Sequence, residues 1–405
     1  MSNSIDLEAR YCAQNYHPLP VVLTRAEGAY VWDEAGKKYL DMMSAYSAVS
    51  HGHGHARLVK LVQEQVERLS IVSRAFYTDK LGPFLEKACT LTGQDMALPM
   101  NTGSEAVETA IKAARKWAYT VKGVAADKAE IIACSGNFHG RTIAIVAMSD
   151  EPQYQHGFGP FPPGFRLVEY GDISSLEAAI NENTAAFLVE PIQGEGGIIV
   201  PPSGYLKAAE ELCRKHNVLL IADEIQTGLG RTGRLLACEH EDVHPDGLIL
   251  GKALGGGILP VSMFLSRRDV MDVFTPGDHG STFGGNPLAA AVGLEALNIL
   301  VDDDLPARSA RMGDYLINAL REIDSPLVRE VRGRGLFIGI ETDPALCSAR
   351  EICESLMDRG LLCKETHVTV VRLAPPLIID ETEIEWAVAQ IRDVLSEIDT
   401  QRLAS

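Results

Sequence analysis

The sequence contains no C-x-x-C pair, no Lys/Arg-rich block, and no apolar run near the ~20 residues that cross a bilayer. Its eight cysteines are scattered, and most lie in apolar stretches such as residues 131–134. This usage favours free buried thiols in a reducing cytosol over disulfides or a zinc site. Residues 1–10 are polar and partly acidic, unlike a secretory signal or an Arg-rich transit peptide. We therefore expect a cytoplasmic protein.

Positive charge is also scarce, with 37 Lys and Arg against 55 Asp and Glu and a formal net charge of -18. Such an acidic protein repels nucleic acid and anionic membranes, so we expect neither as a partner. An anionic substrate would then need a few arginines at its binding site. The length of 405 residues predicts two or three domains, and the share of hydrophobic residues, 46%, is ordinary for a globular protein.

The order of the predicted elements divides the chain into three parts. Residues 1–45 are predicted to form an arm and a small hairpin, with strands at 30–33 and 38–40. Residues 46–295 alternate helices with short, continuously apolar strands. That alternation is typical of an α/β domain with a mostly parallel central sheet and helices on both faces. Residues 296–405 are predicted to form a smaller α+β domain.

Individual elements follow from apolar periodicity and from Gly, Asp or Asn at the segment ends. The strands expected in the large domain are residues 131–134, 185–189, 218–222 and 248–250, and its clearest helices are 104–119 and 205–216. The small domain is expected to contain strands at 337–341 and 368–373. The stripe of the last helix consists of Ile384, Val388, Ile391, Leu395 and Ile398.

Ionisable residues close three of the apolar strands. Glu190, Asp223 and Lys252 each follow such a strand directly. Ligands of open α/β sheets bind beyond the carboxyl ends of the strands, so this edge is the expected site. A desolvated lysine is a nucleophilic amine that can form an imine with an aldehyde cofactor, and Asp223 could pair with a protonated ring nitrogen. A buried Lys–Asp ion pair without any cofactor explains these two residues equally well.

Two loops offer places for a phosphate group. Gly103 and Ser104 stand at the start of a predicted helix, where free backbone amides attract anions. A plain helix cap formed by Thr102 or Ser104 is the simpler explanation of that loop. In a second, glycine-rich loop, the hydroxyls of Ser281 and Thr282 could reach a phosphate, although an ordinary turn would look the same.

A third group of residues could bind a flat ring and carboxylates. Phe138 could stack on a heterocycle, and Arg141 and Arg372 could each hold a carboxylate through two hydrogen bonds, although a lone arginine is usually a surface charge.

Three other patterns are interpreted as coincidences. Residues 228–233 match G-x-G-x-x-G, but the match begins several residues after its strand and no long helix follows. Residues 247–253 lack the glycine spacing and the hydroxyl residue of a phosphate-binding loop. His51, His53 and His55 alternate in a glycine-rich loop without neighbouring Cys or acidic ligands, so we expect no metal site.

Taken together, the motifs resemble the subgroup-III, or ω-amino acid, aminotransferases, which have the PLP-dependent fold of type I. The resemblance extends from about residue 16 to residue 376, with the motifs in the family order. The segments that carry it are 101–106, 138–142, 190–195, 223–228 and Lys252.

The resemblance implies a role for each cofactor-facing residue. Lys252 would hold pyridoxal 5′-phosphate (PLP) and move the proton, and Asp223 would pair with the pyridine nitrogen. Gln226 would bond the 3-hydroxyl of the ring. Phe138 would stack on the ring, beside His139, which stands where some relatives carry Trp.

The resemblance also implies a shared active site. Gly103 and Ser104 would hold the phosphate, together with the Ser281–Thr282 loop, whose Thr282 comes from the neighbouring subunit. A homodimer, or a higher oligomer built from dimers, is therefore expected.

Segments 15–20, 44–49 and 372–376 most resemble family members that act on ornithine. In those members, counterparts of Tyr16 and Arg141 bind the α-amino and α-carboxylate groups, and Tyr46 lines the pocket. Arg372 would bind the near carboxylate of 2-oxoglutarate, and Glu195 would neutralise Arg372 while ornithine is bound. The implied reaction transfers the δ-amino group of ornithine to 2-oxoglutarate.

Acetylornithine and 4-aminobutyrate aminotransferases are the nearest alternatives, and the pair Tyr16 and Tyr46 favours unmodified ornithine over both. A non-catalytic protein, an isomerase or a decarboxylase could share the scaffold. Lys252 argues against the first of these, and Arg372 with Glu195 argues for transamination. The physiological direction, arginine breakdown or proline supply, stays open.

Overall fold

The computed structural model describes residues 3–403, so residues 1–2 and 404–405 of the predicted arm and small domain lie outside the described residues. The central sheet has seven strands in the order β4-β10-β9-β8-β7-β5-β6. All its pairs are parallel except those that β10 makes with β4 and β9. The strands are β4 (Met96–Met100), β5 (Glu130–Cys134), β6 (Phe165–Val168), β7 (Thr184–Val189), β8 (Leu219–Asp223), β9 (Gly247–Leu250) and β10 (Ser262–Ser266). The predicted α/β class with a mostly parallel sheet is confirmed.

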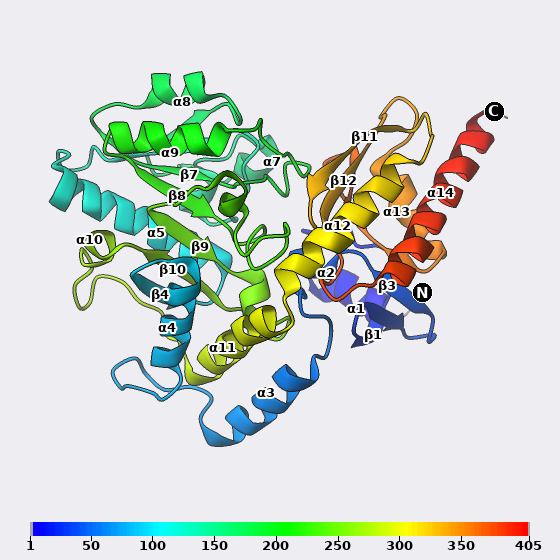
Figure 1. The fold of residues 1–405 in the computed structure, drawn as a ribbon, viewed down its shortest axis with the longest axis horizontal. Coiled ribbons are helices and arrows are strands. Elements are labelled where there is room, and N and C mark those ends of the chain that lie inside the picture. Colours follow the sequence, from blue (N-terminus) through cyan, green and yellow to red (C-terminus); the bar gives the residue numbers. More distant parts are fainter. Residues whose placement is uncertain (1–2, 404–405) are drawn as a thin grey trace.

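Helices cover both faces of this sheet (Figure 1). In β8, Leu219 and Ile221 pack into one core with α5 (Gly103–Trp117), whereas Leu220 and Ala222 pack into another with α9 (Tyr205–Lys215). This alternation explains why the predicted strands are apolar at every position. The expected helices 104–119 and 205–216 are confirmed to within two residues at each end.

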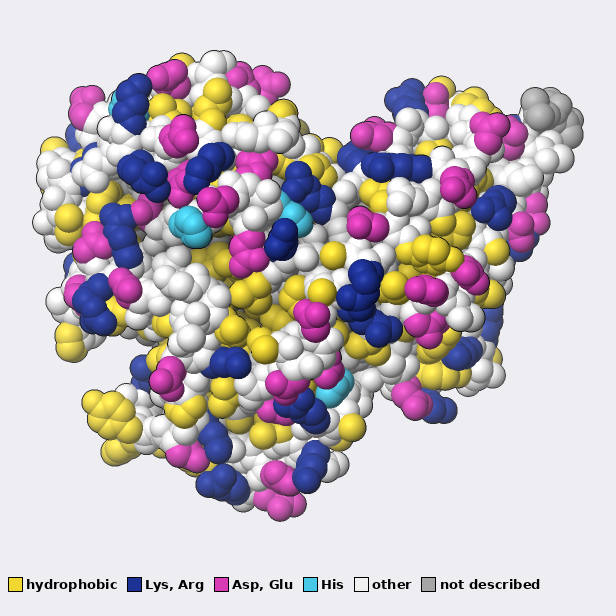
Figure 2. Space-filling model, in the orientation of Figure 1, with side chains coloured by type: hydrophobic (Ala, Val, Ile, Leu, Met, Phe, Trp, Pro, Cys, Tyr) yellow, Lys and Arg dark blue, Asp and Glu magenta, His cyan; other side chains and the backbone are white. Residues whose placement is uncertain are grey.

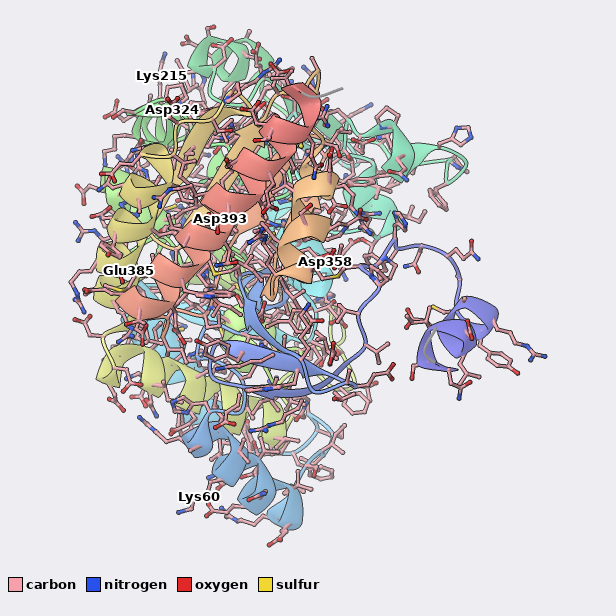
Figure 3. The ribbon with its side chains drawn as sticks, turned by 90° about the vertical axis from the view of Figure 1, so that its right-hand side faces the viewer. Lys60, Lys215, Asp324, Asp358, Glu385 and Asp393 are labelled. Atoms are coloured by element: carbon pink, nitrogen blue, oxygen red, sulfur yellow. The ribbon has the colours of Figure 1, made fainter. Side chains whose placement is uncertain are left out.

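The helices and helical turns not yet named connect these strands or flank them. They are α1 (Asn3–Tyr11), α2 (Ser44–Ser47), α3 (Ala56–Arg68), α4 (Leu81–Thr92), η1 (Ala118–Lys122), α6 (Ile143–Val146), α7 (Pro152–Gln155), α8 (Ile173–Ala179), η2 (Ala237–Glu241), η3 (Lys252–Gly255), α10 (Arg268–Met271) and α11 (Pro287–Asp302). The first of them, α1, buries none of its residues and stands away from the rest of the chain in Figure 3.

A second, fully antiparallel sheet lies in the C-terminal part, in the order β11-β12-β15-β14. Its strands are β11 (Val328–Arg334), β12 (Phe337–Thr342), β14 (Lys364–Thr366) and β15 (Val370–Leu373), and its helices are α12 (Leu305–Arg321), α13 (Ala349–Asp358) and α14 (Glu381–Leu403). All five apolar stripe residues of α14 are buried, as predicted. Figure 3 shows α14 with Glu385 and Asp393 on its surface.

The third sheet joins the two ends of the chain. The predicted hairpin forms from β2 (Tyr30–Asp33) and β3 (Lys38–Asp41), flanked by β1 (Leu23–Glu27). The two-residue strand β13 (Leu361–Leu362) pairs in parallel with β3. Since α11 also runs unbroken through residue 295, the domain divisions at residues 45 and 295 stay predictions.

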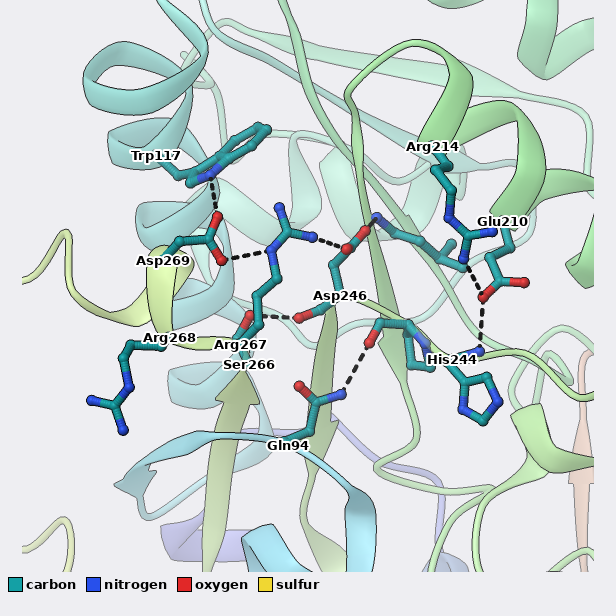
Figure 4. Close-up of polar contacts among 12 residues, drawn as sticks. Gln94, Trp117, Glu210, Arg214, His244, Asp246, Ser266, Arg267, Arg268 and Asp269 are labelled. Carbon is teal, nitrogen blue, oxygen red and sulfur yellow. Dashed lines mark hydrogen bonds and ion pairs between the residues drawn. The ribbon is translucent and has the colours of Figure 1, made fainter.

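A polar network ties together the amino-terminal edge of the parallel strands, opposite the predicted site (Figure 4). Asp246, which precedes β9, accepts a hydrogen bond from the amide of Leu220 at 2.8 Å and pairs with Arg267. Arg267 also bonds Asp269 at 2.6 Å, and Asp269 accepts from the indole of Trp117 at 3.3 Å. These groups satisfy one another, so we assign the network to the stability of the sheet.

Candidate functional site

The strands β7, β8 and β9 are neighbours, so their carboxyl ends bring Glu190, Asp223 and Lys252 to one edge of the sheet. Lys252 begins the turn η3, and its backbone is left-handed, with φ of 45°. Such a conformation is unfavourable for a residue with a long side chain and persists only where the surroundings impose it.

No described residue forms a hydrogen bond or ion pair with the amine of Lys252. Burial lowers the pKa of Lys252 to about 8, although the nearby carboxylate of Glu195 opposes this shift. About a tenth of the amine is therefore neutral, and nucleophilic, at pH 7, far more than for an ordinary lysine with a pKa of about 10.4. The alternative of a buried Lys252–Asp223 ion pair is not realised, because Asp223 has a different partner.

That partner is His139, whose Nδ1 lies 2.7 Å from Oδ2 of Asp223. Burial disfavours a charged His139, but the hydrogen bond to Asp223 and the negative charges of Asp223 and Glu190 together outweigh burial and raise the pKa of the imidazole. The other carboxylate oxygen, Oδ1, accepts the amide of Ile225 at 3.1 Å. Both oxygens of Asp223 are thus anchored, and a carboxylate at this place is the partner that a protonated ring nitrogen requires. The sequence placed His139 beside the ring and did not predict its bond to Asp223.

Glu190 holds the loop that carries Phe138. Its carboxylate accepts the amides of Phe138 at 3.0 Å and Gly194 at 3.3 Å. Burial raises the pKa of Glu190 to about 7, and His139 works against that shift. We therefore assign Glu190 to the support of this loop.

The start of α5 is both a capped helix end and an open place for an anion, the two explanations that the sequence offered. Thr102 caps the helix: its hydroxyl accepts a hydrogen bond from the amide of Glu105, and the carboxylate of Glu105 accepts one from the amide of Thr102 at 2.7 Å. Among the described residues, none accepts the amides of Gly103 or Ser104, which stay available for an anion. A Cβ at Gly140 would lie 2.2 Å from Oγ of Ser104, so the absence of a side chain there lets the two loops meet.

The second phosphate-directed loop lies beside the first. Oγ of Ser281 accepts a hydrogen bond from Nδ2 of Asn101 at 2.8 Å. Thr282 is exposed and has no described hydrogen-bond partner. The structure therefore places Ser281 next to the start of α5 in the same chain, and it leaves Thr282 facing outward.

Gln226 supplies the test of whether these residues fit PLP. Its Nε2 is buried without a hydrogen-bond partner among the described residues. Its Oε1 packs against Gly194 so closely that a Cβ at that position would lie 2.2 Å away, so only glycine leaves room for the amide. A buried amide without a partner is costly, and a ring hydroxyl would satisfy it. A buried lysine of lowered pKa, an anchored carboxylate, this amide and a free helix start match the aldehyde, ring nitrogen, hydroxyl and phosphate of PLP. The residues fit the cofactor.

Two arginines are candidates to bind substrate carboxylates, and only one of them is paired with an acidic side chain. Arg372 has a side chain only 1% exposed, and its Nη1 lies 2.5 Å from Oε1 of Glu195. Burial disfavours a charged Glu195, but Arg372, together with Lys252 and Arg141, outweighs burial and lowers the pKa of this carboxyl. Arg141 is exposed and forms no ion pair with a described residue. The site thus contains one neutralised arginine and one free arginine.

The two predicted tyrosines line a cavity of about 430 Å³ beside Arg372. The ring of Tyr46 lies 4.7 Å from Cζ of Arg372, and Tyr16 is largely exposed at the cavity mouth. Tyr46 belongs to a turn, Ser44–Ser47, in which all four φ angles are positive, between 41° and 72°. Left-handed backbone costs roughly 1–2 kcal/mol per residue, so the turn must be held from outside.

Buried polar groups hold this turn. Asp41 accepts the amide of Ser44 at 2.8 Å, and the hydroxyl of Ser44 donates to the carbonyl of Ala374 at 2.5 Å. Arg231, from the G-x-G-x-x-G match, donates to Ser50 at 3.0 Å and to the carbonyl of Pro375 at 2.5 Å. The glycine-rich segment thus carries an arginine that supports this turn, a role that the sequence did not predict.

The three alternating histidines differ in their surroundings. Nε2 of His51 lies 2.9 Å from the carbonyl of Ala296, and Nε2 of His53 lies 2.7 Å from Asp41. Within residues 3–403, no group of three His, Cys, Asp or Glu side chains is placed to hold a metal ion. Likewise, none of the described helices is long and apolar enough to span a membrane.

Burial of His51 predicts a loss of stability in acid. Burial lowers the pKa of His51 from 6.5 to about 4. Between these values the unfolded chain binds a proton that the folded protein does not, so stability present above 6.5 is lost as the pH falls towards 4. We expect wild type to lose roughly 3 kcal/mol more unfolding free energy over this range than His51→Gln.

Urea denaturation across the same pH range measures this difference. His244→Gln, at an exposed position, is the matched control and should keep the wild-type slope. Parallel stability curves for wild type and His51→Gln would contradict the assignment.

Comparison with known proteins agrees with this geometry. The family model described as aminotransferase class-III matches residues 11–395. A protein of Staphylococcus aureus named ornithine aminotransferase 2 is 59% identical over 390 residues, which cover 96% of this chain and 98% of that protein.

Two solved structures are similar over almost the whole chain. The ornithine aminotransferase of Toxoplasma gondii, described with PLP in partial occupancy at its active site, has a TM-score of 0.97 and 46% identity, covering 98% of this chain and 95% of that one. The acetylornithine aminotransferase of Elizabethkingia anophelis has a TM-score of 0.89 and 48% identity, covering 97% of this chain and 98% of that one. The chain belongs to the class-III aminotransferase family and is a PLP-dependent transaminase.

Proposed function

We propose that the protein transfers the δ-amino group of L-ornithine to 2-oxoglutarate. The products are glutamate and glutamate 5-semialdehyde, which cyclises to pyrroline-5-carboxylate. The observation that carries the proposal is the pair of arginines near Lys252, one free and one neutralised by Glu195. The name of the Staphylococcus aureus relative agrees with this substrate.

The cofactor site follows from the contacts above. When bound, PLP supplies an electron sink for the carbon that loses a proton. Lys252 would hold its aldehyde carbon, and Asp223, fixed by His139, would pair with the ring nitrogen. Gln226 would bond the ring hydroxyl, and Phe138 would stack on the ring. Gly103 and Ser104 would bind the phosphate, together with Ser281 and the partner's Thr282.

Ornithine binds with its δ-carbon at Lys252, whose neutral amine takes the proton from that carbon. Its α-carboxylate lies at the free Arg141, and the hydroxyl of Tyr16 bonds its α-amino group. Tyr46 forms the wall beside the carbon chain. Arg372 stays paired with Glu195, so no unpaired buried cation faces the apolar chain.

2-Oxoglutarate must place its keto carbon where the δ-carbon was. Its far carboxylate then lies at Arg141, and its near carboxylate lies at Arg372. Glu195 leaves Arg372 in this half of the cycle. One site thus accepts a monocarboxylate amine and a dicarboxylate in turn.

Spectral titration tests the substrate. Ornithine, N-acetylornithine and 4-aminobutyrate are added in parallel to the PLP-loaded protein without 2-oxoglutarate. Ornithine is expected to convert the cofactor absorption to that of its amine form at the lowest concentration, with one equivalent of pyrroline-5-carboxylate formed. Conversion at lower concentrations of N-acetylornithine would identify the protein as an acetylornithine aminotransferase instead.

Tyr16 provides the second test of the substrate. Loss of a hydrogen bond to a charged group costs roughly 1.5–3 kcal/mol, so Tyr16→Phe should lower kcat/KM for ornithine about 10- to 100-fold. The value for 4-aminobutyrate, which has no α-amino group, should stay within about twofold. Steady-state assays of both amines measure the difference, and an equal effect on both would contradict the role of Tyr16.

We also propose a homodimer. The start of α5 and the loop after Ser281 border an open cavity of about 630 Å³, lined by Thr102 and Phe283. Nearby, Phe76 and Tyr77 are largely exposed, and Figure 2 shows hydrophobic atoms protruding over the loop that joins α3 and α4. A second copy would cover these rings and place its Thr282 at the phosphate. Sedimentation of the PLP-loaded protein measures the mass.

Cellular location and domain division complete the proposal. All eight cysteines are free, and six of them are buried, which suits the reducing cytoplasm. We propose the arm and hairpin, the PLP-binding domain and the small domain at residues 1–45, 46–295 and 296–405, with β13 completing the sheet of the hairpin.

A further inference from the structure

The short helix α7 carries a tyrosine that no motif singled out. Glu151 caps this helix by accepting the amide of Gln153 at 3.2 Å. The side chain of Gln155 donates to the carbonyls of Val146 at 2.9 Å and Ser149 at 2.6 Å. These bonds fix the helix to the chain just after α6, and they hold Tyr154 in a defined place.

The ring of Tyr154 lies against the guanidinium of Arg141. Cζ of Arg141 is 3.8 Å from the centre of the Tyr154 ring and 5.5 Å from that of Phe138. The two rings are 6.0 Å apart at an interplanar angle of 80°. The guanidinium therefore packs closely against Tyr154, with the nearly perpendicular ring of Phe138 farther from it.

This arrangement leaves Arg141 ready for a carboxylate. The guanidinium lies against the ring and also donates a hydrogen bond to the phenol oxygen of Tyr154. A guanidinium has five N–H donors, so others remain for two parallel bonds to a carboxylate. Burial raises the pKa of the Tyr154 phenol, against the effect of Arg141, so the ring stays neutral near neutral pH. A neutral ring attracts the cation without neutralising it.

The ring also keeps the two arginines apart in function. Glu195 lies within electrostatic reach of both, since Arg372 and Arg141 each lower its pKa. An Arg141 that turned towards Glu195 would abandon the far carboxylate and would compete with Arg372 for its partner. Contact with Tyr154 favours the orientation in which Arg141 stays free.

We propose that Tyr154 is a positioning residue that sets the preference for substrates with a carboxylate far from the reacting carbon. It acts by holding Arg141, and the inference rests on the proposed function. Amines that reach Lys252 without such a carboxylate gain nothing from Tyr154. The selectivity for an amino acid over a plain diamine therefore depends on this ring.

Tyr154→Leu removes the ring, and Tyr154→Phe keeps it as the matched control. Cation–ring contacts contribute about 0.5–2 kcal/mol, so Tyr154→Leu should raise KM for ornithine and for 2-oxoglutarate roughly 3- to 30-fold. We expect kcat to stay within about twofold. With 1,4-diaminobutane, which is ornithine without its carboxylate, kcat/KM should not change. Tyr154→Phe loses only the hydrogen bond between its hydroxyl and Arg141, so it should lie closer to wild type than Tyr154→Leu with ornithine and 2-oxoglutarate and should match wild type with 1,4-diaminobutane.

Binding of glutarate, a dicarboxylate that cannot react, gives a readout that is independent of turnover. Calorimetry on the PLP-loaded protein should show a Kd for glutarate that rises in Tyr154→Leu by the same factor as KM. If Tyr154→Leu does not fold, Tyr154→Met removes the ring with a flexible, unbranched side chain that adapts better to the space.

The outcomes separate this inference from the proposed substrate. If wild type uses ornithine and Tyr154→Leu has the same KM for it, the role of Tyr154 is overturned and the proposed substrate is retained. Equal losses with ornithine and 1,4-diaminobutane overturn it as well, because they indicate general damage. A wild type that prefers N-acetylornithine, with its KM raised in Tyr154→Leu, overturns the proposed substrate and supports the role of Tyr154.

Discussion

Lys252→Ala is expected to abolish transamination of ornithine, with a loss of at least about 10⁴-fold in kcat, because its amine both holds the cofactor and moves the proton. The variant should bind PLP without the absorption band of the lysine-bound cofactor. Lys215→Ala, at an exposed helix end, should behave as wild type.

The same variant separates a structural lysine from a reactive one. Burial lowers the pKa of Lys252 to about 8 from 10.5 in the unfolded chain. Between these values the unfolded chain binds more protons, so the stability of the cofactor-free protein should rise with pH from about 8 to 10.5. Lys252→Ala should lose this rise and, below pH 8, should unfold at no lower urea concentration than wild type. A marked destabilisation below pH 8 would instead indicate a structural amine.

Local pattern predicted most of the central sheet, because its strands are buried on both faces and read as continuous apolar runs. It missed β10, although its buried Met263, Phe264 and Leu265 form the same kind of apolar run. The antiparallel direction of β10 in the sheet cannot be predicted from a local pattern. It also missed both edge strands, β4, which contains Pro99, and β6, which is short and partly exposed. The pairing of Leu361 with Leu40 links positions more than 300 residues apart, which no local pattern contains.

The residues expected at the cofactor could be chosen from the sequence because they directly follow apolar strands or begin a helix, which are the usual places for a ligand site. The residues that hold these side chains in place could not be predicted. Nothing in the local sequence distinguishes Tyr154, because its contact with Arg141 exists only in the folded chain, where α7 lies beside that arginine. The left-handed turn around Tyr46 contains no glycine, which is the usual sequence signal for positive φ. Arg231 lay in a glycine-rich match whose function is to hold that turn.

Glu195→Ala is expected to shift preference from ornithine towards glutamate. Glutamate, like 2-oxoglutarate, needs Arg372 for its near carboxylate, and in wild type it must first displace Glu195 from an arginine that is 1% exposed. The variant offers that arginine unpaired. Ornithine suffers the opposite effect, since an uncompensated buried cation now faces its carbon chain.

The two changes act in opposite directions, so their ratio is the sensitive measurement. We expect the ratio of half-reaction rates, glutamate over ornithine, to rise roughly 10- to 100-fold, which corresponds to about 1.4–2.8 kcal/mol of the 3–5 kcal/mol typical for breaking a buried pair. Glu195→Gln keeps the volume without the charge and should show the same direction. Glu341→Ala, in a pair on β12 with Arg332, is the control for loss of a carboxylate elsewhere. Unchanged half-reaction rates with both substrates would exclude Glu195 as the switch, and the pair with Arg372 would then only stabilise the small sheet.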